Sequence, residues 1–168
     1  MQMHPPQYVN VYIEIERGSN LKYEFNHKTQ TLELDRELPF PYTYPYAYGF
    51  IPGTHADDED ELDVVLVTSK LIKRGTTVQA RIMGVLIMED EKGRDDKIIA
   101  IPFDEYAEDV AEDIFDMPQG VLDTIRWFFT NYKTDEEGKW SLVREFLSRR
   151  AAEKLYVSCM VDDTNLPK

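Results

Sequence analysis

The sequence predicts an α+β fold in which short strands, closed into a small barrel, are followed by helices. Three observations support this fold class. Apolar and polar residues alternate in roughly the first 100 residues, apolar residues recur at helical spacing in the last third, and the length of 168 residues suits one domain, 1–168. A closed barrel hides the edges of a sheet compactly, and an open sheet covered by helices is the alternative.

Alternation and short apolar runs predict the strands. Residues 8–16 alternate between an apolar and a polar face, and residues 21–25 do the same. The apolar run at 64–67 suits a buried strand. Residues 77–90 form the longest strand candidate, and we expect it to bend near Gly84, because glycine inside a strand often marks a bend.

Two further segments complete the first part of the chain. Residues 97–101 are expected to pair with the long strand across the turn around Lys92 and Gly93. The segment 39–52 contains four prolines and four tyrosines, and proline disfavours both a helix and an interior strand there. We expect it to pack through its rings and to aim tyrosine hydroxyls into a cleft, with a rigid loop covering the core as the alternative.

The last third of the chain predicts two helices. The first is expected to begin near Pro118 with Asp116 as its cap and to end at Gly138. Its apolar face has the spacing of three and four that a helix requires. The residues of that face are Val121, Ile125, Phe128 and Tyr132. The second helix is expected over residues 141–156, where it would bury Leu142, Phe146 and Leu147.

The composition excludes several classes of partner. The chain has 32 Asp and Glu residues against 19 Lys and Arg residues, and its net charge of −13 disfavours binding to nucleic acid or to an anionic membrane. A single cysteine, Cys159, cannot form an internal disulfide. The chain has neither an apolar run long enough for a membrane span nor the features of a signal peptide at its N-terminus. We therefore expect a cytoplasmic protein.

The acidic residues cluster in three segments, 57–63, 89–96 and 104–116. In the first segment, Asp60 and Asp63 lie just before a buried strand, and carboxylates crowded together are the ligands that hard divalent cations prefer. The spacing does not fit an EF-hand loop. A solvated acidic loop remains the alternative for this segment. The third segment is interpreted as a solvated surface.

The second acidic segment lies at the predicted hairpin tip. Asp90 continues the apolar face of the strand 77–90, where a carboxylate is costly unless it is paired or bound to a metal ion. Asp95 lies across the turn, close to Lys97. A charged hairpin tip without a site is the alternative.

In their order along the chain, these residues resemble the soluble family I inorganic pyrophosphatases of the short prokaryotic type. The resemblance covers most of the chain, from about Val11 to Trp140. Its segments are IEI at 13–15, KYE at 22–24, DR at 35–36, YPYAYGFIP at 44–52, DEDELDV at 58–64, GVLIMEDEKGRDDK at 84–97 and FFTNYKTDEEGKW at 128–140. Each segment alone is weak, but seven in register are specific.

The resemblance implies a five-stranded OB-like closed barrel flanked by C-terminal helices. It also implies hydrolysis of pyrophosphate to two orthophosphates with several Mg²⁺ ions, for which Mn²⁺ or Zn²⁺ could substitute. Two ions that share a water depress its pKa, and a further carboxylate can take its proton. A homo-oligomer, with a hexamer favoured, is implied by the resemblance only.

The resemblance also assigns roles to individual residues. The metal ligands would be Asp58, Asp63 and Asp95 for the tightest ion, with Asp63 shared by a second ion, and Glu24, Asp90 and Asp95 for ions that arrive with substrate. Asp60 would accept the proton of the bridging water. The phosphate-binding residues would be Lys22, Arg36, Tyr48, Lys97, Tyr132 and Lys133. Of these, Lys22, Arg36 and Tyr48 would take part in catalysis together with Asp60. Glu14, Tyr44 and Glu91 would line the cavity.

The acidic motif departs from the family pattern at two positions. Glu59 stands where the family usually has a small or short polar residue, and Glu61 stands where it commonly has proline, with glutamate in some members. Either change could alter metal preference, although Asp58, Asp60 and Asp63 remain in place. A non-catalytic acidic metal-binding or interaction module on the same barrel is therefore the alternative function. The cationic residues weigh against it, because a metal buffer needs no phosphate grip.

Overall fold

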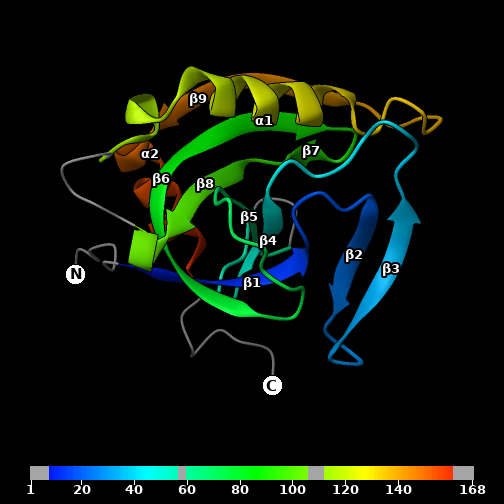
Figure 1. Cartoon of the computed structure of the whole chain (residues 1–168), viewed down its shortest axis with the longest axis horizontal. Coiled ribbons are helices and arrows are strands. Elements are labelled where there is room, and N and C mark those ends of the chain that lie inside the picture. The colour runs from blue at the N-terminus through cyan, green and yellow to red at the C-terminus, as the bar shows by residue number, and fades with distance from the viewer. Residues whose placement is uncertain (1–7, 57–59, 106–111, 161–168) are drawn as a thin grey trace.

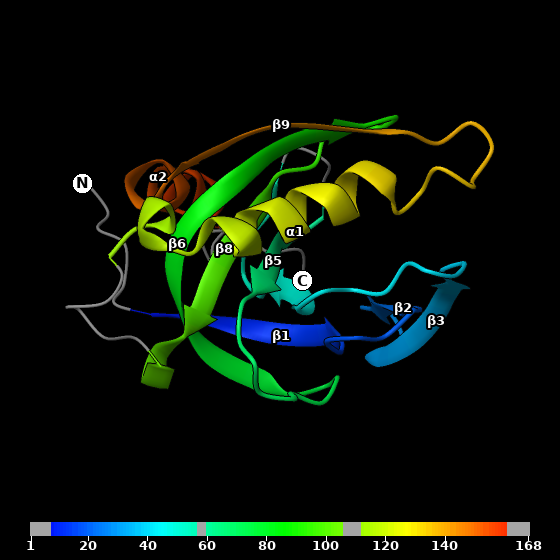
Figure 2. The same ribbon diagram turned by 45° about the horizontal axis from the view of Figure 1, so that its top comes forward.

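A ring of strands forms the centre of the molecule (Figures 1 and 2). The computed structural model describes residues 8–56, 60–105 and 112–160. Within them the strands run in the order β1 (Val9–Ile15), β4 (Ala47–Ile51), β5 (Leu62–Leu66), β8 (Lys97–Pro102) and β6 (Thr77–Asp90). Because β6 also pairs with β1, the sheet closes on itself. The prediction of a closed five-stranded barrel is confirmed.

The long strand β6 takes part in several pairings. Its first part pairs antiparallel with β1, its middle with β8, and its end with the two-residue strand β7 (Gly93–Arg94). The register against β8 shifts between Ile82 and Gly84, so the predicted bend is present. The strands β5 and β8 are parallel, which aligns Asp63 with Lys97.

A two-stranded hairpin stands beside the barrel (Figure 1). Its strands, β2 (Leu21–Asn26) and β3 (Thr31–Glu37), pair with each other in a separate sheet. The predicted strand at 21–25 therefore exists. Lys22 lies opposite Arg36, so one end of the hairpin carries two cations.

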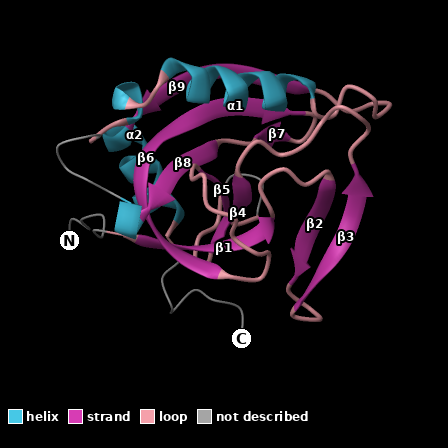
Figure 3. Cartoon of the chain, viewed as in Figure 1, coloured by secondary structure: helices cyan, strands magenta, loops and turns pink. Residues whose placement is uncertain are grey.

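Two helices and one more strand cover the barrel (Figure 3). The helix α1 (Gln119–Asn131) buries Leu122, Ile125, Phe128 and Phe129, and Pro118 is its N-cap residue. After it come the strand β9 (Ser141–Ser148), which pairs with β6, and the helix α2 (Arg149–Cys159). Two single-turn helices, η1 (Phe103–Glu105) and η2 (Ile114–Asp116), lie before α1.

The buried side chains form two clusters. The first includes Val11, Val64 and Ile98 of the barrel strands and Tyr156 of α2. The second joins barrel residues with Tyr44, Tyr48 and the buried face of α1. Burial of apolar side chains on both faces of the barrel wall stabilises the ring and fixes the helix α1 against it. In the described part of the chain, no helix is long and apolar enough to cross a membrane.

The helix predicted over 141–156 is wrong in its first half. Residues 141–148 form β9, because their backbone completes the ladder on the free side of β6. The expected burial of Leu142 is also wrong, since its side chain is exposed, whereas Phe146 and Leu147 are partly buried. The hydroxyl of Ser148 accepts a hydrogen bond from the amide of Ala151, and this cap begins α2 after the strand.

The predicted start of the first helix near Pro118 is confirmed, but its predicted cap and its predicted end are wrong. Asp116 does not cap α1; it completes a capping box with Asp113 around η2. The helix ends at Asn131, before Gly138, and turns occupy residues 132–137. This early end leaves Tyr132 and Lys133 at a helix terminus rather than inside a helix.

The proline-rich segment contains an interior strand, contrary to the prediction. All five residues of β4 are buried, and the strand pairs with β1 and β5 on its two sides. It fits between Pro45 and Pro52, so neither proline has to donate to the ladder. Gly49 is required in it, because a Cβ there would lie 1.8 Å from the carbonyl oxygen of Tyr12.

Candidate active site

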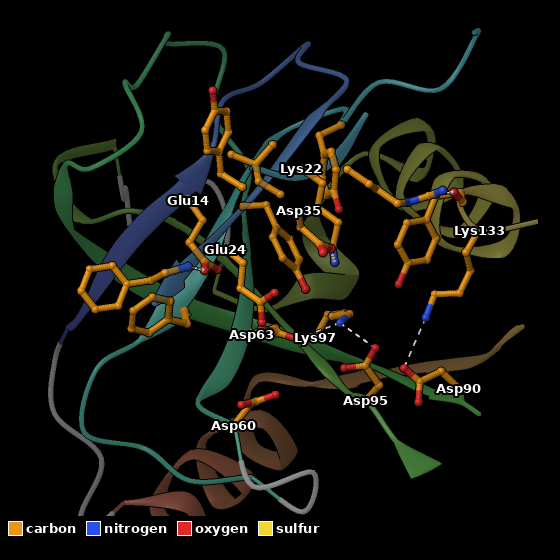
Figure 4. Close-up of a pocket in the computed structure, with 18 of the residues that line it drawn as sticks. Glu14, Lys22, Glu24, Asp35, Asp60, Asp63, Asp90, Asp95, Lys97 and Lys133 are labelled. Atoms are coloured by element: carbon orange, nitrogen blue, oxygen red, sulfur yellow. Dashed lines mark hydrogen bonds and ion pairs between the residues drawn. The ribbon is translucent and has the colours of Figure 1, made fainter. Parts of the chain in front are cut away.

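A cavity of about 390 Å³ lies between the β2–β3 hairpin, the barrel wall and the C-terminal end of α1 (Figure 4). The side chains on its wall are strongly polar. They include all the sequence-predicted site residues that are described: Glu14, Lys22, Glu24, Arg36, Tyr44, Tyr48, Asp60, Asp63, Asp90, Glu91, Asp95, Lys97, Tyr132 and Lys133. Asp58 lies outside the described residues.

Lys97 lies between two of these carboxylates. Its Nζ is 2.8 Å from Oδ2 of Asp63 and 2.9 Å from Oδ2 of Asp95, and its side chain is 2% exposed (Figure 4). Burial alone would disfavour the ammonium, but the two carboxylates outweigh it and raise the pKa of Lys97 well above its usual value. Burial also raises the pKa of Asp95, although the Lys97 ammonium offsets part of this effect.

Lys133 faces the end of the long strand. Its Nζ lies 3.3 Å from Oδ2 of Asp90 and 3.7 Å from Oε2 of Glu91. All three side chains are mostly buried, so the groups are screened by solvent less than surface charges are. The alternative interpretation of Asp90 was a charged hairpin tip without a site. In the structure, Asp90 instead lies on the cavity wall.

The hairpin contributes the remaining cations. The Nζ of Lys22 donates to Oδ2 of Asp35 at 2.5 Å. Arg36 reaches across to the end of α1, where its Nη2 donates to the carbonyl oxygen of Tyr132 at 2.6 Å. Its other guanidinium nitrogens lie 3.4 Å from carboxylate oxygens of Asp135 and Glu136. The guanidinium is therefore held in a fixed orientation at the cavity wall.

Three tyrosines form an aromatic floor. The ring of Tyr44 lies against Tyr48 and Phe128, and Tyr132 packs between Phe128 and Phe129. Burial raises the pKa of all three phenols above the usual value, so they stay protonated and can donate hydrogen bonds into the cavity. The Nζ of Lys97 lies 5.5 Å from the centre of the Tyr48 ring.

Glu14 is buried, although it lies on the polar face of its strand. Its Oε2 accepts a hydrogen bond of 2.9 Å from the backbone amide of Phe25, and its residue exposure is 8%. Burial raises the pKa of Glu14 to about 8, against the opposing effect of that hydrogen bond. Asp63, Glu24 and Glu61 add to the increase. The carboxyl group therefore changes charge near neutral pH.

The donor set of the cavity fits divalent cations. Oxygen atoms of Glu24, Asp60, Asp63, Asp90 and Asp95 come from separate elements and face one space, which is the chemistry that Mg²⁺ requires. Among the described residues, no three acidic, His or Cys side chains lie close enough together to hold one ion. Asp58, which the sequence predicts as a further ligand, lies outside the described residues.

Four charged partners in or beside the cavity had not been assigned from the sequence. Asp35 pairs with Lys22, and Asp135 and Glu136 orient Arg36. His27 contacts Glu61 at the rim. Asp35 belongs to the DR pair at 35–36, and Asp135 and Glu136 belong to the segment 128–140, so these three residues had a signal in the sequence. His27 lies outside the matching segments and had none.

The barrel and its cavity define a class of protein that can hold cations and a polyanion in one site. The sequence model of the family described as inorganic pyrophosphatase matches residues 11–163. The inorganic pyrophosphatase of Thermus thermophilus is 40% identical over 157 residues, which are 92% of this chain and 90% of that protein. That of Sulfolobus acidocaldarius is 42% identical over 137 residues, 80% of this chain and 79% of that protein.

The solved structures give the same result. The crystal structure of inorganic pyrophosphatase from Thermus thermophilus has a TM-score of 0.88 at 39% identity and covers 94% of this chain and 92% of its own. The Helicobacter pylori inorganic pyrophosphatase has a TM-score of 0.87 at 35% identity, covering 95% and 96%. The chain belongs to the inorganic pyrophosphatase family.

Proposed function

We propose that this chain hydrolyses inorganic pyrophosphate to two orthophosphates with the help of divalent metal ions. The observation that carries the proposal is the composition of one cavity wall, which is lined by ten carboxylates and six Lys and Arg side chains. Carboxylates alone would suit a metal buffer. The cations Lys22, Arg36 and Lys133 add a grip on phosphate oxygens that a buffer does not need.

The proposed metal ligands are Asp58, Asp63 and Asp95, together with Glu24 and Asp90. We propose Mg²⁺ as the natural ion, because an all-oxygen donor set suits it, with Mn²⁺ or Zn²⁺ as substitutes. When bound, such ions lower the pKa of a water molecule and neutralise phosphate charge. Asp60, at the exposed edge of the cavity, is proposed to accept the proton of the attacking water.

The cationic residues are proposed to position the substrate. Arg36 presents a planar fork that can contact two phosphate oxygens, while Lys22, Lys97 and Lys133 act as point charges. The protonated hydroxyls of Tyr48 and Tyr132 can donate to phosphate oxygens, and Tyr48 is proposed to orient the attacking group. Glu14, Tyr44 and Glu91 complete the wall. Phosphoryl transfer depends mainly on such positioning and charge stabilisation.

The test is phosphate release from pyrophosphate by the purified protein. We expect turnover with millimolar Mg²⁺, its loss when EDTA is in excess, and its recovery when Mg²⁺ is restored. Inorganic phosphate should appear at two equivalents per pyrophosphate consumed. If no phosphate is released with Mg²⁺, Mn²⁺ or Zn²⁺, the proposed activity is wrong.

We further propose that residues 1–168 form one domain, that it assembles as a homo-oligomer, with a hexamer favoured by the resemblance, and that it acts in the cytoplasm. Support comes from the family match over most of the chain. Sedimentation velocity at micromolar protein tests the assembly. A monomer as the only species at those concentrations would contradict it.

A further inference from the structure

The β2–β3 hairpin reaches its position without strand pairing to the barrel. In the described residues its two strands form a separate sheet, so no ladder of backbone hydrogen bonds joins it to the ring. Yet it carries Lys22, Glu24 and Arg36 on the cavity wall. Backbone hydrogen bonds of Gly18 and Ser19 with Tyr44 hold the base of the hairpin, so the spacing at its turn end depends on side-chain contacts.

Contacts near the turn of the hairpin supply that spacing. The first is the hydrogen bond from the Phe25 amide to the carboxylate of Glu14. The second is an aromatic cluster, in which the ring centre of Phe25 lies 5.2 Å from that of Tyr12 and 6.0 Å from that of Phe50. The third is the contact between Nε2 of His27 and Oε1 of Glu61. This third contact joins the hairpin directly to the first acidic segment, through Glu61.

The His27 side chain contacts both structures that locate Asp63. Its ring packs on Phe50 at 6.0 Å, and Phe50 lies opposite Asp63 in the β4–β5 pairing. Its nitrogen contacts Glu61, which follows Asp60 directly and precedes Asp63 by two residues. Both His27 and Glu61 line the cavity, and neither is proposed to bind metal or phosphate.

We propose that His27 and Glu61 are positioning residues that together clamp the hairpin onto the acidic segment. The clamp keeps the phosphate-binding cations of the hairpin at a fixed distance from the metal-binding carboxylates of the barrel. Its kinetic consequence depends on the proposed pyrophosphatase function, whereas its structural consequence does not. A looser clamp widens the site and weakens binding of Mg²⁺ and substrate more than it slows the chemical step.

Three variants separate the contact between His27 and Glu61 from the packing of the His27 ring. His27→Phe keeps an aromatic ring against Phe25 and Phe50 and removes the nitrogen, Glu61→Gln removes the charge, and the third variant combines both. The matched control is Lys70→Met, which breaks the exposed contact between Lys70 and Asp104, remote from the cavity. His27→Lys places a nitrogen donor opposite Glu61 again and should recover most of the wild-type behaviour.

Hydrogen exchange of the metal-free protein is the first measurement. Because exposed contacts between polar side chains contribute modestly, we expect amides of residues 21–37 to exchange about threefold faster in each single variant, with β6 unchanged. The double variant should exchange no faster than either single variant, since both changes remove one contact. Equal exchange in wild type and single variants, or effects that multiply in the double variant, would overturn the clamp.

Kinetics provide the second measurement. The Mg²⁺ concentration for half-maximal activity and the KM for pyrophosphate should each rise about threefold in the single variants. The kcat should change less, and Lys70→Met should match wild type. A fall in kcat at unchanged KM would overturn the positioning role. If wild type itself releases no phosphate, the proposed function fails, and hydrogen exchange still decides the clamp.

Discussion

At the residue scale, every cation proposed to bind phosphate lies against at least one carboxylate. Lys97 contacts Asp63 and Asp95, and Lys22 contacts Asp35. When substrate binds, each cation would exchange a carboxylate partner for a phosphate oxygen. The cations are therefore already partly desolvated before substrate binds. The cavity is organised by charge before any ligand enters.

The proton acceptor role of Asp60 predicts a large and specific loss. Replacement by asparagine keeps the size of the side chain and removes its basicity. We expect Asp60→Asn to lower kcat by about 10²-fold or more, because general base catalysis contributes on that order. The melting temperature should stay unchanged, since the residue is exposed. Asp123→Asn, an exposed position on α1, is the matched control. Full activity of Asp60→Asn would contradict the role.

Glu14 predicts a pH dependence of stability in the metal-free protein. Its pKa is about 8 in the folded chain against 4.5 when unperturbed, so the folded state binds the proton more tightly. The neutral group costs nothing below pH 4.5, and the penalty grows as pH rises and is complete above pH 8. Glu14→Gln should therefore unfold with a free energy higher than wild type by on the order of 4 kcal/mol at pH 9. Near pH 4.5 the difference should be small.

Urea unfolding with EDTA at the two pH values measures this difference. A pH-independent difference between Glu14→Gln and wild type would show that the carboxyl group does not titrate between those values. Glu16→Gln, directly after the same strand and only partly buried, is the control.

At the scale of elements, the strand β6 sets the shape of the site. Its bend at Gly84 allows one strand to pair with β1 at its start and to bring Asp90 to the cavity at its end. A Cβ at Gly84 would lie 2.6 Å from the Cβ of Ile114 and 2.7 Å from the carbonyl oxygen of Leu147. Packing on both sides therefore leaves room only for glycine.

This crowding predicts that Gly84→Ala destabilises the protein. We expect a loss of about 1–3 kcal/mol in the free energy of unfolding, the usual cost of overpacking. Gly120→Ala makes the same chemical change in α1, where nothing lies within 4 Å, and should stabilise the protein by about 0.5–1 kcal/mol. Chemical denaturation of the two variants gives both values. Equal effects of the two substitutions would contradict the packing argument.

The sequence predicted the strands of the barrel better than the elements after it. Alternation identified β1 and β6 of the barrel and also β2 of the hairpin, because apolar side chains occupy one face of each strand. The strand β9 was mistaken for a helix, because Leu142 and Phe146 also fit helical spacing. Only the free edge of β6, a distant segment, decides that these residues pair as a strand.

The site was predictable in its residues but not in its contacts. Motif matching named fourteen residues whose side chains line one cavity in the structure. The burial of Glu14 could not be inferred, because its hydrogen-bond partner belongs to the hairpin. The contact of His27 with Glu61 likewise joins segments that no local pattern relates.

At the scale of the whole molecule, the net charge of −13 opposes a polyanionic substrate. The cavity resolves this conflict, because its carboxylates belong to the proposed metal side and its cations to the phosphate side. Metal ions and substrate should therefore bind with strong coupling, each raising the affinity for the other by the same factor. A metal buffer or a simple phosphate-binding protein would lack that coupling.

The most direct measurement of this claim is calorimetric titration of wild type with imidodiphosphate, an analogue of pyrophosphate, with EDTA and with Mg²⁺. The account predicts binding at least about tenfold tighter with Mg²⁺, which corresponds to a coupling of about 1.4 kcal/mol. Mg²⁺ should in turn bind tighter by the same factor once the analogue is present. Equal affinity for the analogue with and without Mg²⁺ would contradict a site in which metal ions link the carboxylates to the substrate.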